Sequence, residues 1–385
     1  MMKKYKIFVI NPGSTSTKLA LFENEHKVLE TNVFHDSSVL LQFPTVNAQL
    51  PYRKKLIMDF LSENHIDLSD VDAIVGRGGS CYPVASGVYV IDDKLIEDTA
   101  AGKGGMEHPS NLGVQLAREL QKEFGGRIFM VDPPCVDELC DMARMTGIDG
   151  VPRHTNMHAL NLRGVAMHHA KHVLGKKYED CCFIVCHIDG GISVSAHRYG
   201  RIIDCNDAAG GDGPYTPTRI GSVSVADILE YVRDKDINEV KKLCTRTGGF
   251  VSHFGTSSSD AVHKMAEEGN KKAIRVWDGM KYQIVKYIGA MAAVLGGRVD
   301  GILLTGGLLR FEDITQTIRE QCGWIAPVST YPGEVEHEAL AAGALRVLRG
   351  EEEPKHRPPR LGRLARRGLN PKRNRHSSST AASVL

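Results

Sequence analysis

The start of the chain alternates between apolar runs and short turns. An apolar run at residues 5–10 precedes a turn of small residues, a second run occupies residues 18–23, and a third segment follows at residues 26–34. Short runs of β-forming residues separated by tight turns are typical of paired strands. The pattern predicts an antiparallel hairpin that continues into a third strand.

A second stretch, residues 181–204, has the same layout of strand, Gly-rich turn, strand, tight turn and strand. The two stretches match without a gap when Asn11 is aligned with His187, an offset of 176 residues. A repeat of one supersecondary unit indicates a duplicated architecture. The sequence therefore predicts two domains of related design, each with one turn of the same kind.

The remaining segments alternate between helical and strand patterns. Apolar residues at helical spacing predict helices at residues 110–124, 156–175, 224–234, 270–297 and 336–350. Short apolar runs predict further strands at residues 71–79, 127–132 and 299–307. Such a mixture predicts an α/β fold with helices on mixed sheets, divided into domains at residues 1–160 and 161–350.

Charge separates the last residues from the rest of the chain. Residues 354–385 contain nine Lys or Arg and no acidic residue, so the net charge of +2 conceals a body with a charge of −7. This segment has few large apolar residues, and we expect it to be a disordered tail. A nucleic-acid-binding arm is the alternative, but the segment has no aromatic residue to stack on a base, so nucleic-acid binding is not expected.

Composition limits the cellular setting. No apolar run approaches the roughly 18 residues of a membrane span, and the first apolar run is broken by Asn11 and Pro12, unlike a signal peptide. The nine cysteines are odd in number and most lie in apolar runs. These features favour a cytoplasmic protein with reduced, buried thiols.

The first turn, NPGSTSTK at residues 11–18, is suited to an anion because it offers backbone N–H groups, hydroxyls and a lysine. It is not a P-loop, since Lys18 lacks the second preceding glycine and opens a strand pattern instead of a helix. GGDGP at residues 210–214 likewise fails the dinucleotide signature. Two such turns, one in each half, predict a nucleotide held between two lobes.

Further stretches occur in a recognisable order: VGRGG, HPSNLG, VDPPCVDEL, RHTNMHALN, CHIDGGISVSAHRYGRIID, GDGPYTPTRIG, HFGTS, LTGG and YPGEVEHEALAAGALRVL. Together with VINPGSTSTKLALFE they resemble the acetate, propionate and butyrate kinases, a family within the actin, sugar kinase and Hsp70 ATPase superfamily. The chain length, HPSNLG and GDGPYTP are more similar to butyrate kinases, including branched-chain fatty acid kinases. The resemblance implies a duplicated actin-like (ribonuclease H-like) fold with a cleft between the domains.

The resemblance also implies a reaction, in which ATP and Mg²⁺ phosphorylate the carboxylate of a short-chain acid in an oligomeric enzyme, a dimer or larger. It assigns catalysis to Arg77, His158, Arg219, Asp132 and Asn11, and magnesium to Asp132 and Glu336. Glu334 and Glu338 are close enough in sequence to be alternatives to Glu336. The residues it assigns to ATP or ADP are Ser14, Ser16, Lys18, His187, Gly190, Gly191, Gly255, Thr256, Thr305, Gly306 and Gly307. His108 is expected near the cleft.

Three alternatives remain at this point. The acid is acetate or propionate, or the chain is a non-catalytic, nucleotide-dependent sensor on the same fold. A metal enzyme is the third, with ligands drawn from His154, His158, His168, His169 and His172. One departure from the family also stands out: Asp189 lies where the second turn usually has glycine, and a carboxylate there repels polyphosphate unless a cation compensates.

Overall fold

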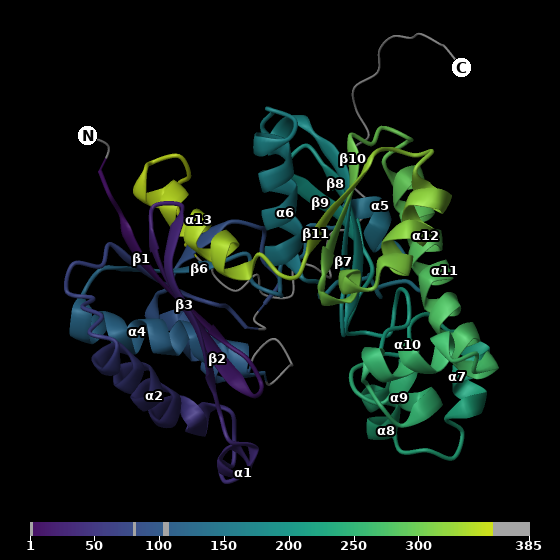
Figure 1. Cartoon of the computed structure of the whole chain (residues 1–385), viewed down its shortest axis with the longest axis horizontal. Coiled ribbons are helices and arrows are strands. Elements are labelled where there is room, and N and C mark those ends of the chain that lie inside the picture. Colours follow the sequence, from purple (N-terminus) through teal and green to yellow (C-terminus); the bar gives the residue numbers. More distant parts are fainter. Residues whose placement is uncertain (1–2, 80–81, 103–107, 357–385) are drawn as a thin grey trace, which may run out of the picture.

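The chain folds into two lobes, each built around one sheet (Figure 1). The computed structural model describes residues 3–79, 82–102 and 108–356, so nearly all of the basic segment at 354–385 lies outside the described residues. The first sheet has the order β3-β2-β1-β4-β6-β5. Its strands are β1 (Lys6–Pro12), β2 (Ser16–Glu23), β3 (His26–Phe34), β4 (Ala73–Gly76), β5 (Val88–Val90) and β6 (Arg127–Val131).

The second sheet has the order β11-β10-β7-β8-β9. Its strands are β7 (Cys182–Ile188), β8 (Ile192–Arg198), β9 (Arg201–Cys205), β10 (Gly301–Gly306) and β11 (Val328–Pro332). In both sheets an antiparallel three-strand unit lies beside parallel strands, β4 in one and β10 in the other. The predicted α/β fold with mixed sheets is confirmed.

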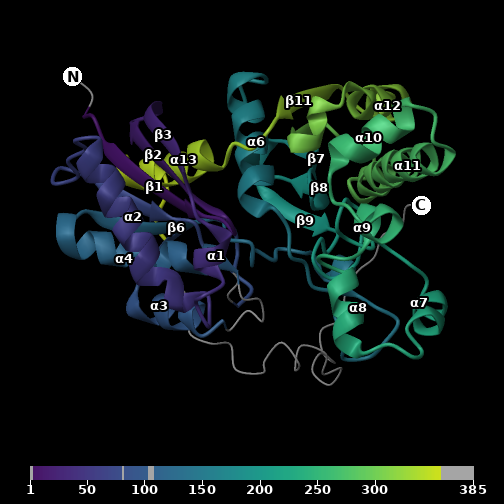
Figure 2. The ribbon, with the colours of Figure 1, turned by 60° about the horizontal axis from the view of Figure 1, so that its bottom comes forward.

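Helices cover the sheets (Figures 1 and 2). In the first half they are α1 (Ser37–Leu40), η1 (Asn47–Gln49), α2 (Leu50–Glu63), α3 (Asp93–Ala100), η2 (Pro109–Asn111), α4 (Leu112–Phe124), α5 (Asp141–Arg144), α6 (Ala159–His172) and η3 (Tyr178–Asp180). Later in the chain they are α7 (Val225–Tyr231), α8 (Ile237–Leu243), α9 (Gly249–Phe254), α10 (Ser259–Glu267), α11 (Lys271–Val294), η4 (Gly307–Arg310), α12 (Glu312–Cys322) and α13 (Glu336–Leu348). Apolar faces of α4 and α11 cover the first and second sheet respectively.

The two hairpin units confirm the predicted repeat with one difference in register. Asn11 pairs with Lys18 across β1 and β2, whereas His187 pairs with Ser193 across β7 and β8. The second turn is therefore one residue shorter, and the expectation of a match without a gap is wrong. Four residues, 13–16, connect the last paired residues of β1 and β2, whereas three, 189–191, connect those of β7 and β8.

The last helix packs on the first sheet, although it follows the second sheet along the chain. Leu340, Ala344 and Leu345 of α13 share a buried apolar cluster with Ile7 and Val75 of the first sheet. Figure 1 shows α13 reaching from the second lobe to the first. The predicted domain boundary between residues 160 and 161 stays a prediction. The predicted second domain extends to residue 350, but its last helix, α13, packs on the first sheet.

The described cysteines are all free thiols, and six of them are buried. Cys181, Cys182 and Cys186 lie at or in β7, as their apolar surroundings predict. Among the described residues, no helix has the length and apolar character needed to cross a membrane.

Candidate active site

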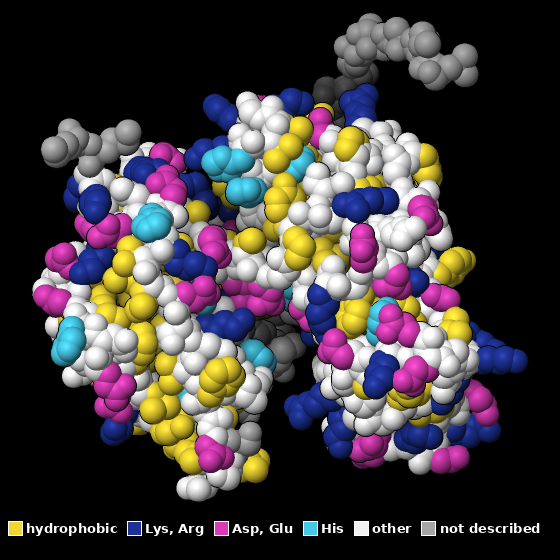
Figure 3. Space-filling view, viewed as in Figure 1, with side chains coloured by type: hydrophobic (Ala, Val, Ile, Leu, Met, Phe, Trp, Pro, Cys, Tyr) yellow, Lys and Arg dark blue, Asp and Glu magenta, His cyan; other side chains and the backbone are white. Residues whose placement is uncertain are grey.

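A pocket of about 390 Å³ opens between the two lobes. Figure 3 shows the surface hollowed there, with acidic, basic and histidine side chains near the opening. The residues predicted for the site that line this pocket are Asn11, Ser16, Lys18, Arg77, His108, His158, Arg219 and Glu336. These residues come from segments that are far apart in sequence. The ends of β1 and β4 and the first residue of α13 meet at the pocket.

Arg77, Glu336 and Asn11 form a buried network at the centre of the pocket. Arg77 follows β4 and contacts Glu336, the first residue of α13, through an ion pair, while Asn11 Nδ2 donates to Glu336 Oε2 at 2.7 Å. Burial acts to raise the pKa of Glu336, but Arg77 and the Asn11 bond outweigh it and hold that pKa below its ordinary value. Arg77 Nε is buried without a partner among the described residues, so one N–H remains for a ligand.

Two histidine rings stack on each other at the pocket, which one of them, His158, lines. The rings of His158 and His187 lie 4.0 Å apart at 22°, and His158 Nδ1 is 2.8 Å from Ser193 Oγ. Burial lowers the pKa of His187 to about 4, and burial together with His187 and the nearby arginines holds the pKa of His158 well below its usual range. Both rings are therefore neutral at physiological pH and serve as hydrogen-bonding groups.

Asn161 of α6 connects three segments behind these rings. Its Nδ2 is 2.8 Å from His187 Nδ1 and donates to Thr305 Oγ1 at 3.0 Å, and its Oδ1 accepts from Val335 N at 2.9 Å. Its side chain is fully buried. An amide that donates to His187 Nδ1 fixes the proton of that ring on Nε2. Sequence reasoning did not select Asn161, because its partners lie on two distant strands and on the loop before α13.

Arg219 is held against the second turn. Thr216 and Thr218 both donate to the carbonyl of Gly190, at 2.7 and 3.2 Å, and Arg219 Nη1 donates to the carbonyl of Ala208. Its guanidinium lies so close to Gly191 that an added Cβ would fall 2.6 Å from Cζ. Burial lowers the pKa of Arg219 from its very high ordinary value, and its Nε has no partner among the described residues.

A buried arginine forms hydrogen bonds to the first turn. Arg53 of α2 donates to Ser16 O at 3.3 Å, to Thr17 Oγ1 at 3.0 Å and to Gln49 Oε1 at 3.0 Å. Burial lowers its pKa to about 10, so it remains a cation at neutral pH. This positive charge behind the turn favours an anion in front of it, and sequence reasoning missed it because the helix pattern of α2 was not recognised.

Carboxylates at the pocket differ from the predicted magnesium pair. Asp132 accepts from Arg163 Nη1 at 3.0 Å and from Gly87 N at 2.6 Å, and it is not among the residues that line the pocket. A buried arginine holds the carboxylate, so Asp132 lies outside the pocket lining, and its predicted binding of magnesium together with Glu336 stays a prediction. The described residues instead bring ligand atoms of His187, Asp189 and Glu334 within 4.8 Å of one another.

Glu334 fits a divalent cation better than Asp132 does. It lines the pocket and lies 3.4 Å from Lys18 Nζ. Burial and the neighbouring Glu336 raise its pKa, so its negative charge is incompletely compensated. Carboxylate oxygens beside a phosphate site are the protein ligands that Mg²⁺ prefers, together with the phosphates themselves.

Several residues predicted to bind the nucleotide do not line this pocket. Ser14 is exposed at the tip of the first turn, and Gly255 and Thr256 follow α9 outside the pocket lining. Thr305 Oγ1 is bound to Asn161 and Gly333, and Gly306 lets the chain pass against Ile188 O with a φ of 109°. The structure thus gives Thr305 and Gly306 internal roles, and their predicted contact with adenosine stays untested.

The alternative histidine site does not assemble. His168 and His172 lie near each other on α6, but His169 binds Tyr331 and His154 lies beside Asp137, while His158 belongs to the pocket. Among the described residues, the candidate metal group consists of His187, Asp189 and Glu334 alone. The metal-enzyme hypothesis built on the other histidines is therefore not supported.

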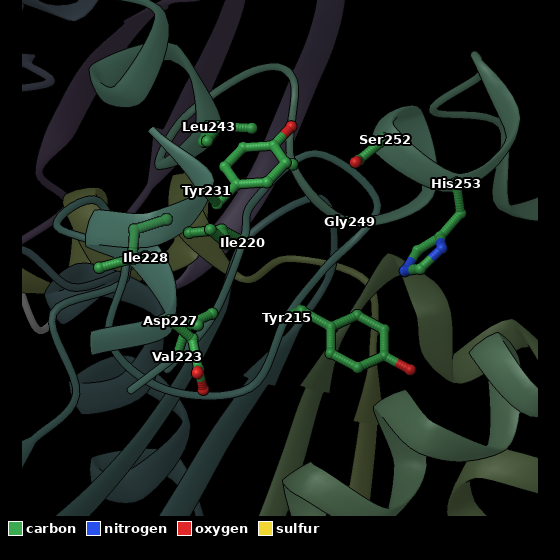
Figure 4. Close-up of a pocket in the computed structure, with 11 residues that line it drawn as sticks. Tyr215, Ile220, Val223, Asp227, Ile228, Tyr231, Leu243, Gly249, Ser252 and His253 are labelled. Atoms are coloured by element: carbon green, nitrogen blue, oxygen red, sulfur yellow. The ribbon is translucent and has the colours of Figure 1, made fainter. Parts of the chain in front are cut away.

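A second cavity, of about 420 Å³, lies in the second lobe among α7, α8 and α9. Figure 4 shows its apolar lining, where Tyr231, Ile220, Ile228 and Leu243 gather opposite Tyr215. It shares no lining residue with the pocket between the lobes. Its lining carries few charged groups, so the pocket between the lobes is the stronger candidate for an anion-binding site.

Together with sequences similar to this chain, the fold and the pocket between the lobes define a two-lobed phosphotransferase. A model of the acetokinase family matches residues 151–324, and similar sequences extend over most of the chain. The chain belongs to the acetokinase family.

Several relatives and solved structures support this assignment. The chain is 42% identical over 353 residues to a probable butyrate kinase of Clostridium botulinum, and 42% identical over 358 residues to butyrate kinase 2 of Clostridium acetobutylicum. Each alignment covers 91% of this chain and 99% of the relative. The fold is similar to that of Porphyromonas gingivalis acetate kinase, with a TM-score of 0.71 at 18% identity, covering 89% of this chain and 99% of the other.

Proposed function

We propose that this chain transfers the γ-phosphoryl group of ATP reversibly to the carboxylate of a short-chain fatty acid, butyrate or a branched relative. The products are an acyl phosphate and ADP. The observation that carries the proposal is a pair of guanidinium groups, Arg77 and Arg219, that line one pocket and each keep a buried Nε with no partner among the residues that the structure describes. The relatives named as butyrate kinases support the choice of acid.

In this mechanism a carboxylate oxygen of the acid attacks the γ-phosphorus as the bond to the ADP oxygen breaks. Arg77 and Arg219 bind the acid and the equatorial oxygens of the phosphoryl group, where planar guanidinium groups match pairs of oxygens. His158, neutral and bound through Nδ1 to Ser193, donates to the phosphoryl group from Nε2. Lys18 and the first turn orient the phosphates.

A magnesium ion, when bound, neutralises charge on the phosphates. Glu334 is the pocket carboxylate that we propose to hold it, in place of Asp132. Glu336 keeps Arg77 in position through their ion pair. Closure of the lobes over the pocket excludes water and so limits hydrolysis of ATP.

The test is acyl phosphate formation from ATP and Mg²⁺ with acetate, propionate, butyrate or isobutyrate, detected as the hydroxamate. We expect kcat/KM to be highest for butyrate or isobutyrate. A clear preference for acetate or propionate would overturn the assignment of the acid. Normal ATP binding with no product from any acid would favour a nucleotide-dependent sensor on this fold.

We also propose that the protein is a homo-oligomer, a dimer or larger, and that it acts in the cytoplasm. The free, buried cysteines support a reducing compartment. Light scattering of the purified protein would test the oligomeric state, and a monomer at micromolar concentration would contradict it.

A further inference from the structure

The turn between β7 and β8 holds a carboxylate of its own chain where backbone N–H groups converge. Asp189 Oδ1 accepts from Gly190 N at 2.7 Å, and Asp189 Oδ2 accepts from Gly307 N, directly after β10, at 2.7 Å. Converging backbone N–H groups of this kind bind anions. Gly307 lies 118 residues after Asp189 in sequence, and the one carboxylate joins the two turns.

The corresponding turn of the first lobe contains no such anion. In that turn Gly13 N donates to Ser16 O at 2.7 Å, and the charged side chain that the turn itself contributes is a cation, Lys18. The acids beside it, Glu334 at 3.4 Å from Lys18 Nζ and Glu336 at 2.7 Å from Asn11 Nδ2, come from the segment at the start of α13 and do not bind the backbone N–H of Gly13. The buried Arg53 adds positive charge behind the turn. The two turns therefore differ in electrostatics: the first turn attracts an anion, and the second already contains one.

Charges around Asp189 show what a phosphate would meet there. A carboxylate oxygen of Glu334 lies within 4.8 Å of a carboxylate oxygen of Asp189 and of a ring nitrogen of His187, so a second acid faces the same space. Arg219 lies against Gly191 and supplies positive charge on the other side of the turn. A polyphosphate placed at the N–H groups of Gly190 and Gly307 would have to displace the carboxylate or meet its charge.

We propose that Asp189 is an internal anion that occupies the phosphate-binding N–H groups of the second turn and thereby sets the affinity of this chain for polyphosphates. The proposal rests on the proposed function for ATP as the substrate, and it adds that the N–H groups of Gly190 and Gly307 face the phosphates of ATP. It makes Asp189 a determinant of affinity. Binding of a nucleoside without phosphates does not depend on it.

The experiment is calorimetric titration with inorganic tripolyphosphate, and separately with adenosine, in EDTA. The proteins are the wild type, Asp189→Gly, Asp189→Asn and the control Asp234→Asn, which removes one charge from an exposed side chain of the same lobe. We expect Asp189→Gly to bind tripolyphosphate at least tenfold more tightly than the wild type. Asp189→Asn keeps the volume without the charge and should fall between them, whereas Asp234→Asn should match the wild type.

Adenosine affinity should be the same in all four proteins. The proposal is overturned if Asp189→Gly and Asp189→Asn, both folded by thermal melting, bind tripolyphosphate no more tightly than the wild type, or not at all. This outcome is distinct from failure of the proposed function, because acyl phosphate formation by the wild type is measured without reference to either variant. A wild type that makes no acyl phosphate, beside an Asp189→Gly protein that gains tripolyphosphate affinity, would refute only the kinase.

Discussion

Gly191 provides a selective way to displace Arg219. A Cβ added at Gly191 would lie 2.6 Å from Cζ and Nη1 and 2.8 Å from Nη2 of Arg219. Ordinary carbon contacts are about 3.5–4.0 Å, so the guanidinium must move by roughly 1 Å. The end of a flexible side chain moves at little cost in stability, but a misplacement of about 1 Å at a catalytic group can reduce the rate about 10²-fold.

Gly190→Ala is the matched control, because no atom lies within 4 Å of its Cβ and its φ is outside the left-handed region. We expect Gly191→Ala to lower kcat/KM for acyl phosphate formation about 10²-fold while its Tm stays close to that of the wild type. Gly190→Ala should retain nearly full activity. Equal activity in the two variants, or an equal loss in both, would refute the role given to the position of Arg219.

Three further predictions concern the buried network and the histidines. Arg77→Met should lower the free energy of unfolding by about 3–5 kcal/mol at pH 7, because it leaves the buried Glu336 without its ion pair. The loss should be smaller at pH 5, where Glu336 of the variant takes up a proton. A double-mutant cycle with Glu336→Gln that gives additive losses would contradict this. Burial lowers the pKa of His197 to about 3, so the unfolded state binds more protons below pH 6.5 and the stability of the wild type falls with falling pH. Between pH 7 and pH 5 the free energy of unfolding of His197→Gln should fall by about 2 kcal/mol less than that of the wild type, and equal changes in the two proteins would exclude this residue as the cause. Asn161→Ala should cost about 1–3 kcal/mol by leaving the N–H of Val335 without its partner, and a loss within the error of the denaturation curves would show that water replaces the amide.

The sequence predicted the elements that depend on local pattern. Both three-strand units and the helices α4, α6, α11 and α13 formed where apolar spacing indicated them. The difference in register between the hairpins was not predictable, because an alignment without gaps does not show where each strand ends and therefore how many residues each turn contains. Several helices of the second lobe, α8, α9, α10 and α12, were not recognised from the pattern, and their arrangement around the apolar cavity was not expected.

For the site, motifs located the residues but not their partners. Arg77, His158, Arg219 and Glu336 meet at one pocket, as the motifs indicated. Asp132 did not join them, because Arg163, 31 residues later in the chain, binds it. An ion pair between distant residues leaves no local signal, and neither does a buried amide such as that of Asn161.

The packing of α13 on the first sheet has a consequence for synthesis of the chain. Strands β1, β2 and β4 leave the ribosome early, yet the helix that completes their buried apolar cluster, at Glu336–Leu348, is made after the whole second lobe. Until then Ile7, Val9 and Val75 expose apolar surface, and closing this contact requires a loop of more than three hundred residues. We infer that the first lobe cannot finish folding during translation, and that a nascent chain which stops before α13 is prone to aggregate.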